Sequence, residues 1–147
     1  MSKMAKYLLT VFVLVALLGL TGCEWTLSGA KKDAVLAWSE AAVDNLLAGW
    51  TTNDYAAFSR DFDADMQAEI TAAKFADLKQ DLDNQLGNYI SRRVDRVTQA
   101  DEFYVVTYAA KFEQEEALKI TVAFHRSDQS ISFLAFNSEK VSWSTFQ

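Results

Sequence analysis

Cysteine, histidine and proline are almost missing from this chain of 147 residues, which contains one cysteine, one histidine and no proline. A single cysteine cannot form an internal disulfide, so packing alone must stabilise the folded part. One histidine and one cysteine are also too few for the usual tetrahedral zinc sites. Because there is no proline-rich or low-complexity stretch that could act as a stiff linker, we expect one folded domain.

Recognisable catalytic motifs are missing as well. No Gly-x-Ser-x-Gly sequence occurs, which excludes the usual nucleophile elbow. A histidine-based acid–base mechanism would have to use His125. The alternation around Phe124 places His125 with Lys119 and Thr121 on the outer face of a strand, away from the core. We therefore predict no catalytic residue, no metal and no cofactor.

One acidic stretch has the alternating start of a calcium loop. Its four members are Asp61, Asp63, Asp65 and Glu69. The glycine needed at the sixth position is replaced by Met66, and the closing glutamate at the twelfth by Ala72. These carboxylates are instead predicted to cap helices and to face solvent.

The charge balance excludes another class of partner. The formal net charge is −6, and removal of residues 1–22, which contain two lysines and no acidic residue, lowers it to −8. The densest cationic group, Arg92, Arg93 and Arg96, is interrupted by Val94 and Asp95 rather than forming a basic patch. Nucleic acid is therefore not an expected partner.

The only long apolar run, from Tyr7 to Leu20, follows Lys3 and Lys6, as in a secretory signal. Its fourteen residues would span only about 21 Å as a helix, less than the roughly 30 Å core of a bilayer. The sequence Leu20-Thr21-Gly22-Cys23 then resembles the bacterial lipobox. The alternatives are an ordinary secretory signal with a chance cysteine and an uncleaved signal anchor.

The resemblance to the lipobox implies cleavage between Gly22 and Cys23 and attachment of diacylglycerol to the Cys23 thiol. Two acyl chains suffice for stable membrane attachment. The expected organisation is a signal peptide over residues 1–22, a lipidated tether over 23–30 and a single domain over 31–147. The expected location is the cell membrane or the outer membrane, with the domain on the extracytoplasmic side.

The periodicity of apolar residues predicts an α+β domain with helices first. A long helix is expected over Lys31–Trp50, a short one capped by Asn53 or Asp54, and a third from Thr71 to Gly87, which would act as a left-handed terminator. The period then changes to two. About four antiparallel strands are expected, over 89–98, 104–112, 118–125 and 130–136, in a curved sheet with the long helix across one face.

Aromatic residues on the inward stripes form a candidate pocket lining. These residues are Trp38, Tyr55, Tyr104, Tyr108 and Phe124. Tyrosine and tryptophan offer apolar walls with a few hydrogen-bond donors, which suits a small apolar ligand. Plain core packing explains the same pattern.

The segment from Asn53 to Phe62, followed by Phe75, Leu78, Leu82 and Gly87-Asn88-Tyr89, resembles the uncharacterised bacterial domain of unknown function 3887. The resemblance covers about residues 31–136 and implies a cone similar to nuclear transport factor 2, also described as cystatin-like. Relatives with this fold include isomerases and dehydratases with an acid, base or histidine in the cone, but no such residue can be transferred to this chain. Such relatives also commonly pair through the outer sheet face, which here would expose Thr107, Lys111, Lys119, Thr121 and His125.

The leading hypothesis is a non-enzymatic accessory module of the cell envelope, anchored to the membrane. Its expected partners are the membrane through the N-terminal lipid, another protein or a second copy, and a small apolar ligand. One alternative is a small-molecule lyase or isomerase that uses the interior of the cone. Another is a carrier of lipid or peptidoglycan fragments.

Overall fold

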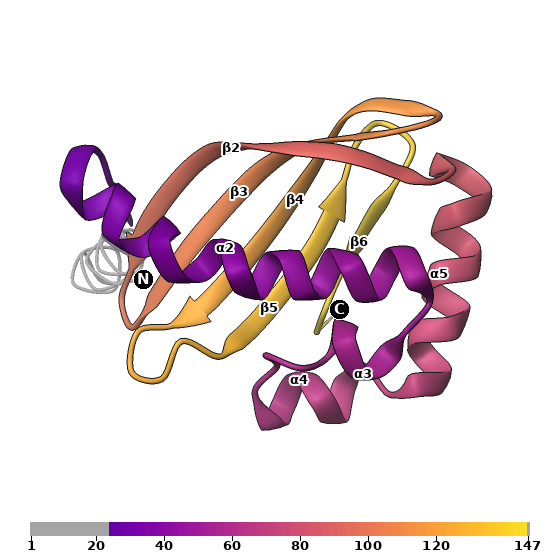
Figure 1. Ribbon diagram of the computed structural model, residues 1–147, viewed down its shortest axis with the longest axis horizontal. Coiled ribbons are helices and arrows are strands. Elements are labelled where there is room, and N and C mark those ends of the chain that lie inside the picture. The colour runs from indigo at the N-terminus through magenta and orange to yellow at the C-terminus, as the bar shows by residue number, and fades with distance from the viewer. Residues whose placement is uncertain (1–23, 147) are drawn as a thin grey trace, which may run out of the picture.

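The computed structural model describes residues 24–146, so the predicted signal peptide and the predicted attachment residue Cys23 lie outside the described residues. The elements follow in the order β1 (Glu24–Thr26), α2 (Gly29–Thr52), α3 (Tyr55–Phe58), α4 (Ala64–Glu69), α5 (Ala72–Leu86), β2 (Tyr89–Ala100), β3 (Phe103–Phe112), β4 (Glu115–His125), β5 (Ile131–Asn137) and β6 (Ser142–Ser144). Figure 1 shows α2 running across one face of the sheet towards α5. No helix in this part of the chain combines the length and apolar character needed to cross a bilayer.

Helix α2 contributes an apolar stripe to the core at helical spacing. Its large buried side chains are Val35, Val43, Leu46, Leu47 and Trp50. The helix ends at Asn53, whose positive φ of 55° directs its N–H back to the carbonyls of the last turn. The Trp50 ring lies between Phe58, Phe75 and Phe136, with centroids 5.5–6.0 Å away. This aromatic cluster joins α2 to α3, α5 and β5.

Side-chain caps start the three shorter helices. Asp54, Asp63 and Thr71 each accept a hydrogen bond from the backbone N–H three residues later. Helix α5 ends at Gly87, which has a positive φ of 70° but a ψ of −162°. The prediction of a left-handed terminator is therefore wrong: this conformation is essentially restricted to glycine, but it is not left-handed helical.

The sheet contains six antiparallel strands in chain order, so the α+β class is confirmed while the predicted count of about four is too low. Register shifts interrupt the pairing of β2 with β3, of β3 with β4 and of β4 with β5, for example between Val94 and Arg96 and between Ala110 and Phe112. Because bulges bend strands and increase their twist, they account for the curvature of the sheet. The added strands, β1 and β6, lie at the two edges.

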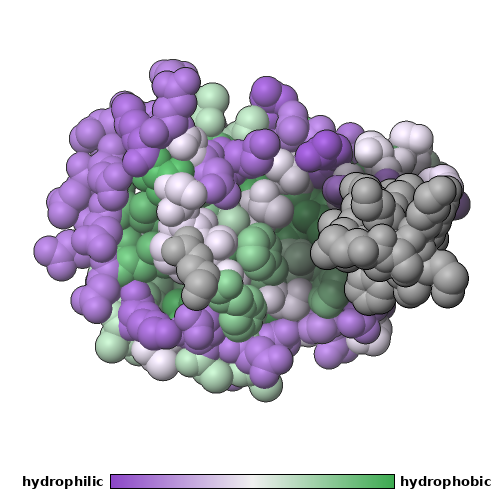
Figure 2. Space-filling model, turned by 180° about the vertical axis from the view of Figure 1, so that it is seen from behind, coloured by the Kyte–Doolittle hydropathy of each residue, from purple (hydrophilic) through white to green (hydrophobic). Residues whose placement is uncertain are grey.

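Alternation along the strands assigns one face of the sheet to the core. Tyr108, Ile120, Val122 and Leu134 on the helix-covered face are fully buried. The opposite face, called the outer face below, contains the alternate residues of the same strands. Figure 2 shows this side of the molecule, where apolar and weakly polar side chains form a strip framed by hydrophilic ones.

The predicted tether over residues 23–30 is already folded from Glu24 onward. Residues 24–26 form β1, which pairs with Thr98 to Ala100 of β2, and Gly29 and Ala30 belong to α2. Strands of three residues are too short to show a period in the sequence. The folded domain therefore begins closer to Cys23 than the sequence pattern indicated.

Candidate functional site

A hollow of about 350 Å³ opens on the outer face, where β3, β4 and β5 meet the start of α4. Its apolar lining consists of Ala100, Phe103, Val105, Ala123, Phe133 and Phe146. Strand register explains why these side chains meet, since Phe103 pairs with His125 and Val105 pairs with Ala123, which pairs in turn with Phe133. Phe146 is 54% exposed although it is fully apolar. Apolar side chains thus form most of the wall of the hollow.

His125 lies at the rim of this hollow and forms a side-chain hydrogen bond with Asp63 across the fold. Its Nε2 atom is 2.9 Å from Asp63 Oδ2, and its ring centroid is 5.0 Å from that of Phe103. The other carboxylate oxygen of Asp63 accepts the N–H of Met66 and caps α4. His125 thus lies on the predicted face, but it is half-buried and paired. The two residues are 62 positions apart in the sequence, so no local sequence pattern indicates that they meet.

The acidic stretch before α4 does not converge on one point. Asp61 accepts a hydrogen bond from Asn45 at 3.0 Å, Asp63 contacts His125, and Glu69 pairs with Lys74 at 3.2 Å. Within residues 24–146, no group of three or more histidine, cysteine, aspartate or glutamate side chains could hold a metal ion. The carboxylates instead cap a helix and bind neighbouring side chains.

The five aromatic residues predicted to line a pocket fall into separate places. Trp38 contacts both Phe124 and Tyr104, with ring centroids 5.2 Å and 6.3 Å away. Tyr55 lies elsewhere, with its hydroxyl donating to the carbonyl of Ile70 at 2.6 Å. Tyr108 and Phe124 are fully buried in the core. Three of the five therefore form one cluster under α2, and side chains fill the space around Tyr108.

A polar cluster around the buried Tyr108 was not visible in the sequence. The Tyr108 hydroxyl donates to Glu40 Oε1 at 2.6 Å, and Arg92 Nη2 lies 3.1 Å from Glu40 Oε2 and 2.8 Å from Asp44 Oδ1. Burial and the hydrogen bond to Glu40 raise the pKa of Tyr108 above its ordinary value. Burial alone would lower the pKa of Arg92, but the contacts with Asp44 and Glu40 raise it overall. These contacts keep Tyr108 protonated and Arg92 charged, and they link α2 to β2 and β3.

Comparison with known proteins gives one match. The family described as "Protein of unknown function (DUF3887)" matches residues 43–133, from the middle of α2 to β5. No curated protein and no solved structure matches the chain. The matched segment includes Asp63, Tyr108 and His125, and it covers more than half of the sequence. The chain therefore belongs to the DUF3887 family of proteins of unknown function.

Proposed function

We propose that this protein is a non-enzymatic accessory module of the cell envelope, held at the cell membrane or outer membrane by lipid on Cys23, which pairs through the outer face of its sheet. The support for the anchor is the order of the leader: two lysines, an apolar run and Leu20-Thr21-Gly22-Cys23. Two acyl chains on one residue would give stable attachment. The folded domain then lies on the extracytoplasmic side.

The observation that carries the binding role is the apolar hollow on the outer face. Phe103, Val105 and Phe133 are only half-buried there, and no helix among the described elements covers them. Exposed apolar surface of this kind, rimmed by polar residues, marks interaction sites on soluble domains. A partner that covers the hollow would remove these side chains from water.

The distribution of charge on the outer face favours a second copy of the chain as that partner. Near the hollow the face is acidic, with Asp63 and Asp65 in its lining. Towards the opposite ends of the strands it is basic, with exposed Arg93, Arg96 and Lys119. A two-fold axis through the middle of the face places the basic end of each copy against the acidic end of the other. The hollows then contribute the apolar centre of the interface.

The enzymatic and carrier alternatives, which use the interior of the cone, have less support. The hydroxyl of Tyr108 is already bound to Glu40, and Phe124 is packed against Trp38. Tyr104 is half-buried beside the same tryptophan. These contacts are those of a packed core, and they leave the outer face as the better-supported surface for binding.

Light scattering on the full chain purified in detergent tests the pairing. We expect a dimer for the wild type and a monomer for Phe133→Asp, which places a charge in the hollow. Ala37→Asp adds the same charge on the exposed side of α2 and should leave the dimer intact. A monomeric wild type, or equal dissociation of both variants, would contradict the proposal.

A charge exchange tests the orientation of the pair. Arg96→Asp should weaken the dimer by bringing like charges together. Adding Asp65→Lys to the same chain should restore the dimer. The signs of the two charges are then exchanged, so the positive charge at residue 65 of one copy again faces a negative charge at residue 96 of the other. If the double variant is weaker than Arg96→Asp alone, the two copies do not pair in this arrangement.

Growth on radiolabelled palmitate tests the anchor separately. Wild-type protein should incorporate label and fractionate with membranes, whereas Cys23→Ser should do neither. A wild-type chain that lacks label and keeps residues 1–22 would refute lipidation without affecting the light-scattering result.

A further inference from the structure

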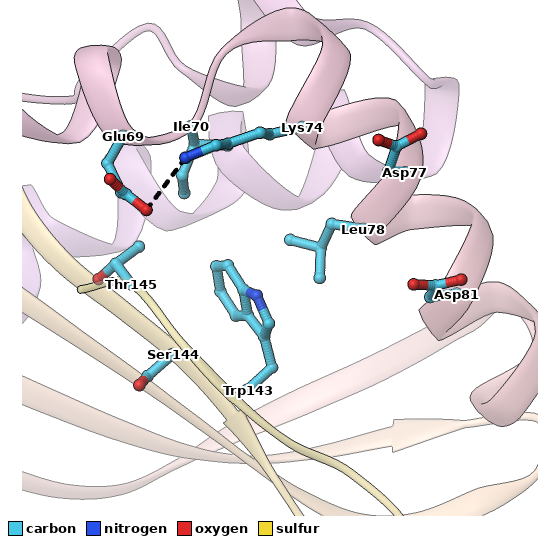
Figure 3. Close-up of a pocket in the computed structure, with 9 residues that line it drawn as sticks. All are labelled: Glu69, Ile70, Lys74, Asp77, Leu78, Asp81, Trp143, Ser144 and Thr145. Carbon is cyan, nitrogen blue, oxygen red and sulfur yellow. Dashed lines mark hydrogen bonds and ion pairs between the residues drawn. The ribbon is translucent and has the colours of Figure 1, made fainter. Parts of the chain in front are cut away.

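A cleft of about 320 Å³ separates α4 and α5 from the edge strand β6. Figure 3 shows the Trp143 ring projecting from β6 into this space, towards Leu78 and Ile70. The ring also contacts Phe136, with centroids 5.7 Å apart and planes inclined at 43°. Because the indole is only half-buried, part of its aromatic surface is open to an occupant of the cleft.

The helical wall of the cleft carries unbalanced negative charge. Lys74 Nζ is neutralised by Glu69 at 3.2 Å (Figure 3), whereas Asp77 and Asp81 have no ion pair within residues 24–146. These two residues are four apart on α5, so their charges repel each other across one helical turn. A cation between them would relieve this repulsion and could at the same time stack on Trp143.

The strand wall offers unpaired backbone groups. Thr145 N–H donates to Leu134 O, and Ser138 N–H donates to Val141 O. Hydrogen-bonded and non-hydrogen-bonded pairs alternate along an antiparallel ladder, so the pair between these two, Phe136 with Trp143, is also a hydrogen-bonded one. The backbone groups of Ser142 and Ser144 therefore point away from β5. In the described part of the chain β6 is the last strand of the sheet, and this edge faces no further strand.

We propose that the cleft binds an extended peptide segment of a partner protein, which pairs with β6 and places an arginine side chain on Trp143 between Asp77 and Asp81. A peptide residue opposite Trp143 points to the same face of the sheet as Trp143, and so into the cleft. Arginine suits the site because its planar guanidinium stacks on an aromatic ring and donates to carboxylates simultaneously. This binding is independent of pairing through the outer face.

Fluorescence anisotropy with the full chain in detergent tests the proposal. The probe is a fluorescein-labelled peptide, acetyl-Thr-Val-Arg-Val-Thr-amide, compared with the same peptide carrying neutral citrulline for arginine. We expect saturable binding of the arginine peptide and at least roughly tenfold weaker binding of the citrulline peptide. Asp77→Asn with Asp81→Asn should weaken the arginine peptide to a similar extent.

A matched control separates the cleft from general attraction to an acidic protein. Asp33→Asn with Glu102→Gln removes the same charge from exposed positions on α2 and the β2–β3 turn, and should leave the affinity unchanged. A peptide N-methylated at both valines, which cannot donate to Ser142 and Ser144, should bind at least tenfold more weakly. Trp143→Leu should also weaken binding of the arginine peptide. If the Trp143→Leu protein fails to fold, the double variant Asp77→Asn with Asp81→Asn still tests the proposal.

The overturning results are distinct. Equal affinity for the arginine and citrulline peptides would exclude a cation site. If Asp77→Asn with Asp81→Asn and Asp33→Asn with Glu102→Gln lose the same affinity for the arginine peptide, binding depends only on the net charge of the protein. Full affinity of the N-methylated peptide would exclude pairing with β6. Failure of the wild type to bind the arginine peptide at all would refute the proposal, whatever the light-scattering experiment gives.

Discussion

The Tyr108 hydroxyl donates a 2.6 Å hydrogen bond to Glu40 Oε1 and so ties the centre of β3 to α2. Removing the hydroxyl in Tyr108→Phe should lower the free energy of unfolding by about 1–2 kcal/mol, because the hydrogen bond between this buried hydroxyl and the partly exposed carboxylate of Glu40 is lost. Urea denaturation measures the change. Tyr104→Phe is the control and should cost less than about 0.5 kcal/mol, since the Tyr104 hydroxyl has no hydrogen-bond partner among residues 24–146. Equal losses in the two variants would contradict the role of this contact.

The same hydroxyl predicts a loss of stability at alkaline pH. The pKa of Tyr108 is raised in the folded state. Below the unfolded-state pKa of about 10, both the folded and the unfolded protein keep the phenol proton, whereas above pH 10 only the folded protein keeps it. Stability from this group is therefore complete below pH 10 and falls as the pH rises further. Urea denaturation should show the advantage of wild type over Tyr108→Phe shrinking by about 1 kcal/mol per pH unit above pH 10. An advantage that stays constant up to pH 11.5 would show that this tyrosine ionises normally.

Asp63 has two structural contacts, as the cap of α4 and as the partner of His125. Asp63→Ala should reduce the free energy of unfolding by about 1–2 kcal/mol, mostly through loss of the cap. Hydrogen exchange should become faster in α4 while that of α5 changes little. Asp65→Ala, in the first turn of the same helix, should stay within about 0.5 kcal/mol of wild type. Unchanged exchange in α4 would mean that the cap is dispensable.

At Gly49 the backbone of α2 lies directly against that of α3. A β-carbon at this position would clash with the backbone nitrogen of Phe58, which cannot move without shifting α3. Gly49→Ala should therefore cost about 2 kcal/mol or more, although alanine normally favours a helix over glycine. Thermal unfolding monitored by circular dichroism checks this, with Ala48→Gly at the exposed neighbouring position expected to cost only about 1 kcal/mol. A stabilised Gly49→Ala protein would indicate that the two helices are less closely packed.

The long elements could be predicted from the sequence because their burial patterns are regular. Val35, Val43 and Trp50 share one face of α2, and Tyr108, Ile120 and Leu134 alternate with less buried residues on their strands. The α+β class followed from these patterns, whereas the family was indicated by the resemblance of the segment that begins at Asn53. The lipid anchor remains a prediction, because it depends on residues 1–23.

The candidate site was harder to predict because it depends on contacts between distant residues. His125 and Asp63 are 62 positions apart, and Tyr108 and Glu40 are 68 apart. The alternation around Phe124 predicted the face of His125 but contained no information about α4, a six-residue helix that was not expected. Only the capping position of Asp63 gave a local signal.

Strand β1 begins at Glu24, one position after the residue proposed to carry lipid, and it is hydrogen-bonded to β2. If lipid is attached at residue 23, no flexible linker separates it from the domain, and the edge of the sheet that contains β1 would rest on the lipid headgroups. Trp25, which is 66% exposed, would lie beside these headgroups. Strand β6 forms the opposite rim. Of all the surfaces described, the cleft at Trp143 would then project farthest into the periplasm or the medium.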